Sequence, residues 1–138
     1  INDHVLRGAS SITSITIPSS VTSIGGYAFS SCSGLTSINI LNGVTSIGNN
    51  AFHNCSSMRK IYMPSSVTTI FAPSYSDSPF YGWNSTAIIC CGASSKPGGW
   101  ETYWNYYGSG YLTTIWNVAG FPQQNADWIF ALAHMLVQ

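Results

Sequence analysis

Charge is what this sequence has least of. Among its 138 residues, four are Lys or Arg and four are Asp or Glu, so the formal net charge is zero. Proteins that bind nucleic acid present a basic patch to the phosphates, and we therefore expect no nucleic-acid partner. The four acidic residues, Asp3, Asp77, Glu101 and Asp127, include no close pair in sequence of the kind that glycosidases use.

Catalytic and metal-binding motifs are also missing. The chain has no H-E-x-x-H, no G-x-S-x-G and no glycine-rich phosphate loop, and its three histidines are far apart in sequence. The four cysteines lack C-x-x-C spacing. We therefore expect a protein that is not an enzyme and holds neither a metal nor a cofactor.

Long hydrophobic runs are missing too. The apolar stretch Trp128–Val137 has ten residues, whereas a helix that spans a bilayer needs about 20. We expect no membrane span and interpret the stretch as a docked helix that Asn125 caps. No charged segment followed by an apolar run precedes the repeats, and the first residue is Ile1. We therefore expect the chain to be either part of a longer protein or a protein whose leader is missing from this sequence.

What the sequence does have is a repeat. A 23-residue pattern is written twice between Ile12 and Ser57, and a third copy begins at Met58. A period in the twenties predicts a solenoid, in which each coil buries its apolar side against its neighbours. Stacking the copies gives columns of identical or similar apolar residues: Ile15, Ile38 and Ile61; Ile17, Ile40 and Met63; Val21, Val44 and Val67; Ile24, Ile47 and Ile70.

Each coil can be interpreted physically. Apolar and polar residues alternate in Ser14–Ile17, which predicts parallel strands at Ser14–Ile17, Ser37–Ile40 and Lys60–Met63. A second extended piece follows at Val21–Ile24 and stops at Gly25, where a Cβ would obstruct the backbone. Tyr27–Phe29 is expected to form a short helical turn that places its phenylalanine in the core.

The third coil departs from the pattern. Aligning residues 79–83 with residues 51–55 requires five extra residues within Phe71–Ser78. We expect a last strand at Thr86–Cys90, a solenoid over residues 1–91 (repeats 12–34, 35–57 and 58–86 plus the terminal strand), and an aromatic cap over residues 92–138, with a possible terminal helix. Tyr111–Val118 is a candidate strand within that cap, and Val5 or Leu6 is expected to cover the opposite end.

Cys32 and Cys55 occupy one core column. We interpret them as buried free thiols that act as small hydrophobic residues. A disulfide between neighbouring coils remains an alternative, because adjacent strands lie only about 4.8 Å apart. Of the neighbours Cys90 and Cys91, one is expected to face outward.

The string L-x-x-I-x-I-P-x-x-V-x-x-I-G-x-x-A-F-x-x-C resembles the BspA-type, or Treponema pallidum-type, leucine-rich repeat over about residues 12–90. The resemblance implies a right-handed leucine-rich-repeat solenoid of the α/β horseshoe class, with a parallel sheet on its concave face. Lys96, Pro97, Gly99, Trp100, Trp104 and Asn105 match the segment that often closes such arrays. The resemblance to this family further implies a cell-surface or secreted protein that binds host proteins, matrix or other cells.

Outward positions on the strands are the candidate ligand-binding residues. They are Thr16, Ser37, Asn39, Arg59, Lys60 and Tyr62, and the last three bring charge and a ring together, as binding hot spots do. We therefore expect adhesion through the concave face, with another protein as partner. Two alternatives stay open: a structural spacer of a larger surface protein, and glycan binding by Trp100, Tyr103 and Trp104.

Overall fold

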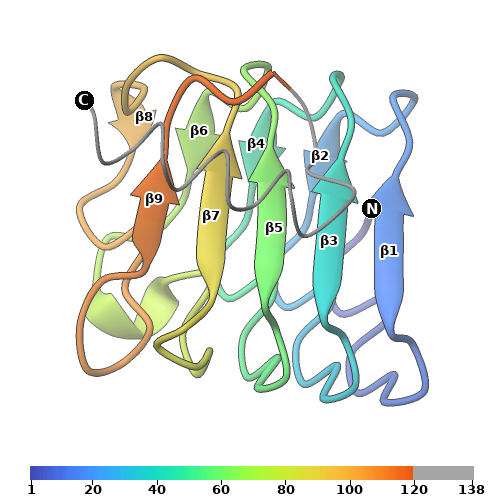
Figure 1. Cartoon of the computed structure of the whole chain (residues 1–138). Coiled ribbons are helices and arrows are strands. Elements are labelled where there is room, and N and C mark those ends of the chain that lie inside the picture. The colour runs from blue at the N-terminus through green and yellow to red at the C-terminus, as the bar shows by residue number, and fades with distance from the viewer. Residues whose placement is uncertain (120–138) are drawn as a thin grey trace.

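The computed structural model describes residues 1–119, and within them the chain coils into a solenoid built on two parallel sheets (Figure 1). The expected helix at Asn125–Val137 lies outside the described residues. The larger sheet contains, in spatial order, β1 (Ser14–Ile17), β3 (Ser37–Ile40), β5 (Lys60–Met63), β7 (Ile88–Cys91) and β9 (Thr113–Ile115). The smaller one contains β2 (Ser23–Ile24), β4 (Ser46–Ile47), β6 (Thr69–Ile70) and β8 (Gly99–Trp100).

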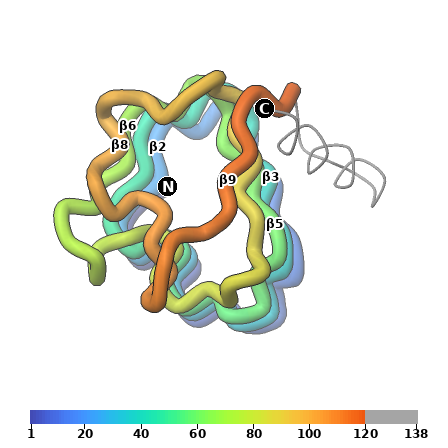
Figure 2. Tube along the Cα trace, turned by 60° about the vertical axis from the view of Figure 1, so that its left-hand side comes forward, coloured from blue at the N-terminus to red at the C-terminus, as the bar shows by residue number. Residues whose placement is uncertain are grey.

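The register follows the repeat. Ser14 pairs with Ser37, and Ser37 pairs in turn with Lys60, which confirms the predicted parallel stacking. Lys60 pairs in turn with Ile88, and the separation of these two residues exceeds the period by five residues. The reason is an insertion between them, which carries the short 3-10 helix η1 (Tyr75–Asp77). Figure 2, along the stack, shows the coils superposed, with this insertion projecting to one side.

The core is a set of columns that run from coil to coil. Phe29 stacks on Phe52 with centroids 5.5 Å apart, and Phe52 stacks on Phe80 at 6.3 Å, both pairs nearly parallel. The isoleucine column Ile24, Ile47, Ile70 continues into Trp100 of β8. The aromatic segment therefore belongs to the last coil itself, since β8 and β9 extend the two sheets.

The predicted helical turn at Tyr27–Phe29 is wrong. Alternate amides in this segment donate to the next coil: Tyr27 N–H to Asn49 and Phe29 N–H to Ala51. The amides between them form tight turns within the coil. Ala28 N–H, for example, donates to the Gly25 carbonyl. Because half of the donors are used between coils, a helix cannot form, and Tyr27 adopts a left-handed φ of 57°.

Gly25 and Gly48 lie where neighbouring coils approach closely. A Cβ built on Gly48 would lie 2.6 Å from the Gly26 nitrogen, and one on Gly25 would lie 2.6 Å from the Asp3 nitrogen. Neither contact is sterically tolerable. The prediction that a side chain would obstruct the backbone is therefore confirmed, and the obstruction is the adjacent coil.

The first residues form a partial coil. His4, Leu6 and Gly8 donate their amides to carbonyls of the first full coil, those of Gly26, Ala28 and Ser30. Val5 and Leu6 do not cover the end, however, because their side chains are 54% and 39% exposed. Partly buried residues pack against the core there instead, namely Ile1, Ala9, Ile12 and Ile15.

The cysteine column supplies hydrogen-bond donors inside the core. Cys32 and Cys55 are buried free thiols, as predicted, and their sulfurs donate to the carbonyls of Leu6 (3.4 Å) and Phe29 (3.2 Å). In the third coil, the indole Nε1–H of Trp83 donates to the Phe52 carbonyl at 2.8 Å. The same three carbonyls also accept backbone N–H groups, those of Ala9, Cys32 and Cys55, so the side-chain donors add a second hydrogen bond to each carbonyl inside the core.

We predict that Phe52→Ala lowers the free energy of unfolding by about 3–5 kcal/mol, because it empties a fully buried site between two stacked rings. Phe29→Ala should cost less, since Phe29 has a stacked ring on one side. Denaturant melts of both variants measure the difference. Losses below about 1 kcal/mol for both would contradict the stacked core.

A second prediction concerns the thiols. Burial raises the pKa of Cys55 and of Cys90 to about 12, so both should react with a disulfide reagent near pH 8 at least ~100-fold more slowly than in the unfolded chain. In the unfolded chain these thiols lose their protons at a lower pH than in the folded protein. The free energy of unfolding should therefore fall as the pH rises above about 8.5. Rapid modification of the native protein, followed by mass spectrometry, would contradict this.

Candidate functional site

The exposed side of the larger sheet brings together most of the residues predicted to bind. Register places Thr16 beside Asn39 and then Tyr62, and Ser37 beside Lys60. Thr16 is exposed, while Ser37, Asn39 and Lys60 are partly exposed. Towards the N-terminal coils the face thus consists of hydroxyl and amide groups, with one lysine at its centre.

Tyr62 is not the exposed anchor that its sequence position predicts. Its side chain is only 9% exposed and packs in a small cluster with Cys90 and Ile115, bordered by Ile88 and Val118. Its hydroxyl donates to the Val118 carbonyl at 3.1 Å, and burial raises its pKa.

The cause is the composition of the last two coils, which put Cys90 and Ile115 in the same row as Tyr62. For the same reason neither Cys90 nor Cys91 is open to solvent: Cys91 enters the main core and Cys90 the small cluster, both fully buried. The signal in the sequence was the run Ile88-Ile-Cys-Cys91. A strand without alternation is buried on both faces.

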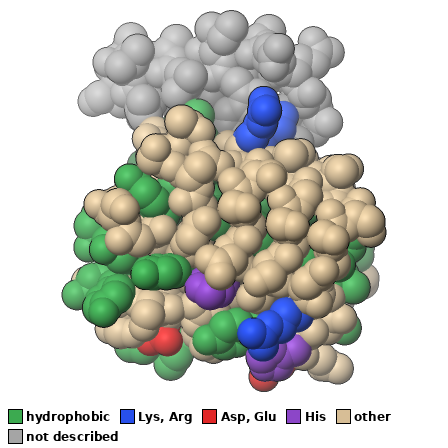
Figure 3. All heavy atoms as spheres, turned by 90° about the horizontal axis from the view of Figure 1, so that it is seen from below, with side chains coloured by type: hydrophobic (Ala, Val, Ile, Leu, Met, Phe, Trp, Pro, Cys, Tyr) green, Lys and Arg blue, Asp and Glu red, His purple; other side chains and the backbone are tan. Residues whose placement is uncertain are grey.

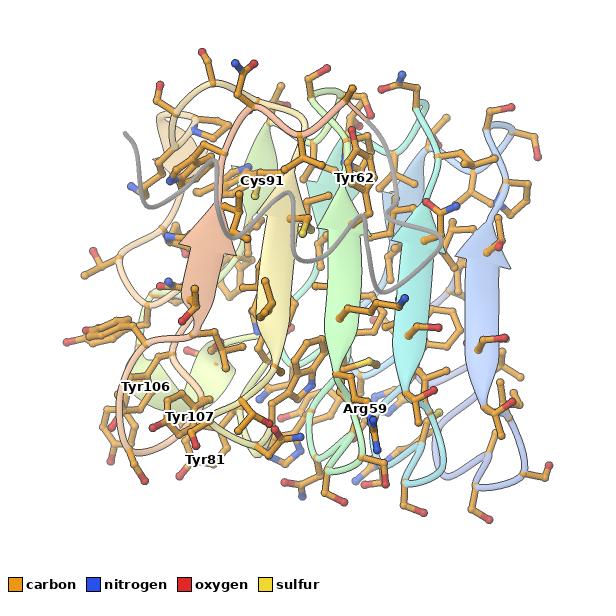
Figure 4. All side chains as sticks on the ribbon, in the orientation of Figure 1. Arg59, Tyr62, Tyr81, Cys91, Tyr106 and Tyr107 are labelled. Atoms are coloured by element: carbon orange, nitrogen blue, oxygen red, sulfur yellow. The ribbon has the colours of Figure 1, made fainter. Side chains whose placement is uncertain are left out.

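Arg59 lies just before β5 and is exposed (Figure 4). It lines a shallow depression of about 630 Å³ at the start of the strands, together with Thr36, Ser56, Ser57, Asn84 and Thr86. The Asn84 side-chain amide donates to the carbonyls of Met58 (2.6 Å) and Ser56 (3.3 Å), which fixes one wall.

This arrangement suits an anionic group. A guanidinium forms two parallel hydrogen bonds with a carboxylate. The hydroxyls of Ser56 and Ser57 in the same depression add further donors, whereas those of Thr36 and Thr86 already donate to Thr13 and Asn84. The sequence identified Arg59 but not the depression, because Asn84 and Thr86 join it only through the shifted register of the third coil.

The rings proposed for glycan binding lie mainly in the core. Trp100 and Trp104 are 1% and 5% exposed, and Trp100 donates its indole N–H to the Val67 carbonyl at 3.0 Å. Both pack with Trp116, at centroid distances of 5.7 and 5.9 Å. The end of the core needs a large apolar cover, so these indoles cannot present their faces to a sugar. Tyr103 remains partly exposed.

A group of partly exposed tyrosines was missed by the sequence reasoning. Tyr81 and Tyr106 lie together at the turn edge of the solenoid (Figure 4), with ring centroids 6.3 Å apart. Tyr75 of η1 joins them, 6.0 Å from Tyr106. They come from the insertion, the third coil and the last coil, so no fixed spacing links them in the sequence.

Residues 1–119 contain no group of three or more His, Cys, Asp or Glu side chains arranged to hold a metal ion. No helix in the same range is both long and apolar enough to cross a bilayer.

We predict that Tyr62→Ala destabilises the fold by ~2 kcal/mol or more, because it empties a buried site and removes a hydrogen bond. Tyr62→Phe should cost about 1 kcal/mol, the share of the hydroxyl. Thermal and denaturant melts measure both. An alanine variant as stable as the wild type would mean that the ring is solvated.

The comparison with protein families agrees with the geometry. A family model described as the BspA type leucine rich repeat region, with six copies, matches residues 1–85. No curated protein and no solved structure gave a match. The matched range covers well over half of the chain and coincides with the regular coils. The chain therefore belongs to the BspA-type leucine-rich repeat family.

Proposed function

We propose that this protein is a non-enzymatic binding module that engages another protein through the exposed face of the larger sheet. The observation that carries the proposal is the depression around Arg59 at the rim of that face. Leucine-rich repeats are commonly used for protein interaction, and this family is commonly associated with cell surfaces. A surface-attached or secreted location and a host or matrix protein as partner are part of the proposal.

The chemistry of the face favours a partner with an acidic group at its centre of contact. Thr16, Ser37 and Asn39 bury little apolar area and are well hydrated, so they contribute little affinity. Arg59 offers a charge-assisted contact beside several hydroxyls.

The carboxylates in the described residues are already engaged elsewhere. Asp3 accepts from Gly26 N–H, Asp77 from the Ser74 hydroxyl, and Glu101 from Ala72 N–H. Because none of these three bonds involves Arg59, these carboxylates do not compete with an acidic side chain of the partner, and the pair would contribute both affinity and orientation.

The prediction is that Arg59→Ala weakens partner binding at least tenfold, about 1.4 kcal/mol, with the thermal melt unchanged. The assay immobilises a panel of surface and matrix proteins and measures the affinity of each variant for those bound by the wild type. Binding should also weaken as salt is raised.

Two controls sharpen the test. Arg7→Ala removes an exposed arginine at the far end of the solenoid and should bind as the wild type does. Ser37→Ala changes the sheet face by one hydroxyl and should also be neutral. Unchanged affinity of Arg59→Glu would overturn the proposed site, and a wild type that binds no protein of the panel would favour the structural-spacer alternative.

A further inference from the structure

A continuous row of aromatic rings crosses the turn side of the solenoid, away from the Trp cluster of the core. Its centre is Tyr27, His53, Tyr81 and Tyr106, at successive centroid distances of 6.2, 5.5 and 6.3 Å. At the C-terminal end it widens through three tyrosines that each contact Tyr106, namely Tyr75, Tyr103 and Tyr111. We call these seven residues the tyrosine band. Seen from below, Figure 3 shows hydrophobic and histidine side chains following one another across this surface.

The core does not require these rings. The buried ladder is made by Phe29, Phe52 and Phe80, whereas Tyr75 and Tyr111 are each 56% exposed and the other band residues are partly exposed. Contiguous exposed aromatics on a soluble domain mark interaction sites. Stacked, tilted and edge-to-face contacts between the rings already restrict these side chains, so binding would cost little additional rotamer entropy.

Polar side chains within two residues of Tyr75, Tyr103 and Tyr106 already have hydrogen-bond partners in the protein. The carboxylates of Asp77 and Glu101 accept hydrogen bonds from Ser74 and from the Ala72 amide, and the Asn105 amide donates to the Leu112 carbonyl. A sugar needs such groups for its hydroxyls, because desolvated hydroxyls without partners are costly. Nucleic acid would need cations, and the cation in contact with the band is Arg7, 5.4 Å above Tyr27 at its N-terminal end.

What the band offers is therefore apolar ring surface together with phenol hydroxyls. These suit an uncharged partner that combines apolar groups with unpaired hydrogen-bond acceptors. An extended proline-rich segment has both, since a polyproline II helix makes no internal hydrogen bonds and its carbonyls stay open. Aromatic-lined surfaces recognise such segments in several domain families.

The spacing of the coils also fits. Neighbouring coils are about 4.8 Å apart along the stack, and one turn of polyproline II, three residues of about 3.1 Å each, advances about 9 Å. One turn of the ligand thus spans two coils, and a residue in every third position would face alternate rings of the band.

We propose that the tyrosine band binds an uncharged, proline-rich segment of another protein in the polyproline II conformation. This site is separate from the Arg59 depression and does not depend on the function proposed for it. Tyr81 and Tyr111 supply ring surface in the middle and at the wide end, and the Tyr81 hydroxyl is available as a donor to a ligand carbonyl.

The test titrates the protein with a blocked polyproline peptide of about ten residues and follows binding by NMR shifts of the band residues and by calorimetry. The wild type should bind saturably. Tyr81→Ser and Tyr111→Ser should each weaken binding about tenfold, the size typical of an aromatic hot spot. Tyr81→Phe should lose less, since it removes only the hydroxyl. Leu41→Ser, an exposed apolar residue outside the band at 39% exposure, is the matched control and should bind normally.

Several results would overturn the proposal. They are absence of saturable peptide binding by the wild type, unchanged affinity in folded Tyr81→Ser and Tyr111→Ser, and chito- or cello-oligosaccharides that bind the band in place of the peptide. Arg59→Ala should leave peptide binding unchanged. A loss in that variant would show that the two surfaces are one site, and would contradict the separation made here.

Discussion

Hydrogen bonding between coils is the interaction on which the rest of this structure depends. In the described residues the strands are short, two to four residues each, and none could persist without a neighbour on which to place its amides and carbonyls. The turns follow the same rule, since Tyr27 and Phe29 donate to the next coil rather than within their own segment. Threonine side chains extend the pattern: the hydroxyls of Thr36, Thr45 and Thr68 each donate to a backbone carbonyl one period earlier.

This dependence explains why the core uses donors as well as hydrophobic groups. The carbonyls of Leu6 and Phe29 receive thiol hydrogens, and that of Phe52 receives an indole hydrogen. The exchange of cysteine for tryptophan in the third coil preserves the hydrogen bond while it adds a ring against Phe52 and Phe80. Each coil thus keeps a side-chain donor at this position even though the residue changes from cysteine to tryptophan.

The sequence predicted the parts of the fold that repeat. Columns at a 23-residue offset gave the strands, their parallel register and the five-residue insertion, because burial imposes the same apolar residue on each coil. It could not predict the burial of Tyr62, which depends on Cys90 and Ile115 of coils that no longer obey the period. The Arg59 depression was hidden for the same reason.

The tyrosine band was invisible for a different reason. Its contacts do not keep to one column: His53 and Tyr81 occupy equivalent positions of successive coils, whereas Tyr27 reaches His53 from a different column, so no single offset connects the rings. Surface side chains are long enough to reach neighbours outside their own column, and a pattern based on backbone spacing does not record such contacts. What the repeat does fix is the backbone from which these side chains extend.

The insertion that carries η1 shows how such a scaffold can acquire new surface. Coils are joined by backbone hydrogen bonds at fixed positions, so extra residues are accommodated only between those positions, as they are here between β6 and β7. Lengthening a loop costs little free energy, roughly 0.6 kcal/mol for each doubling of its length. A single coil can therefore add a projecting group such as Tyr75 without any change in the core columns on either side. Stability and recognition are encoded by different residues of one coil, and each can vary while the other is kept.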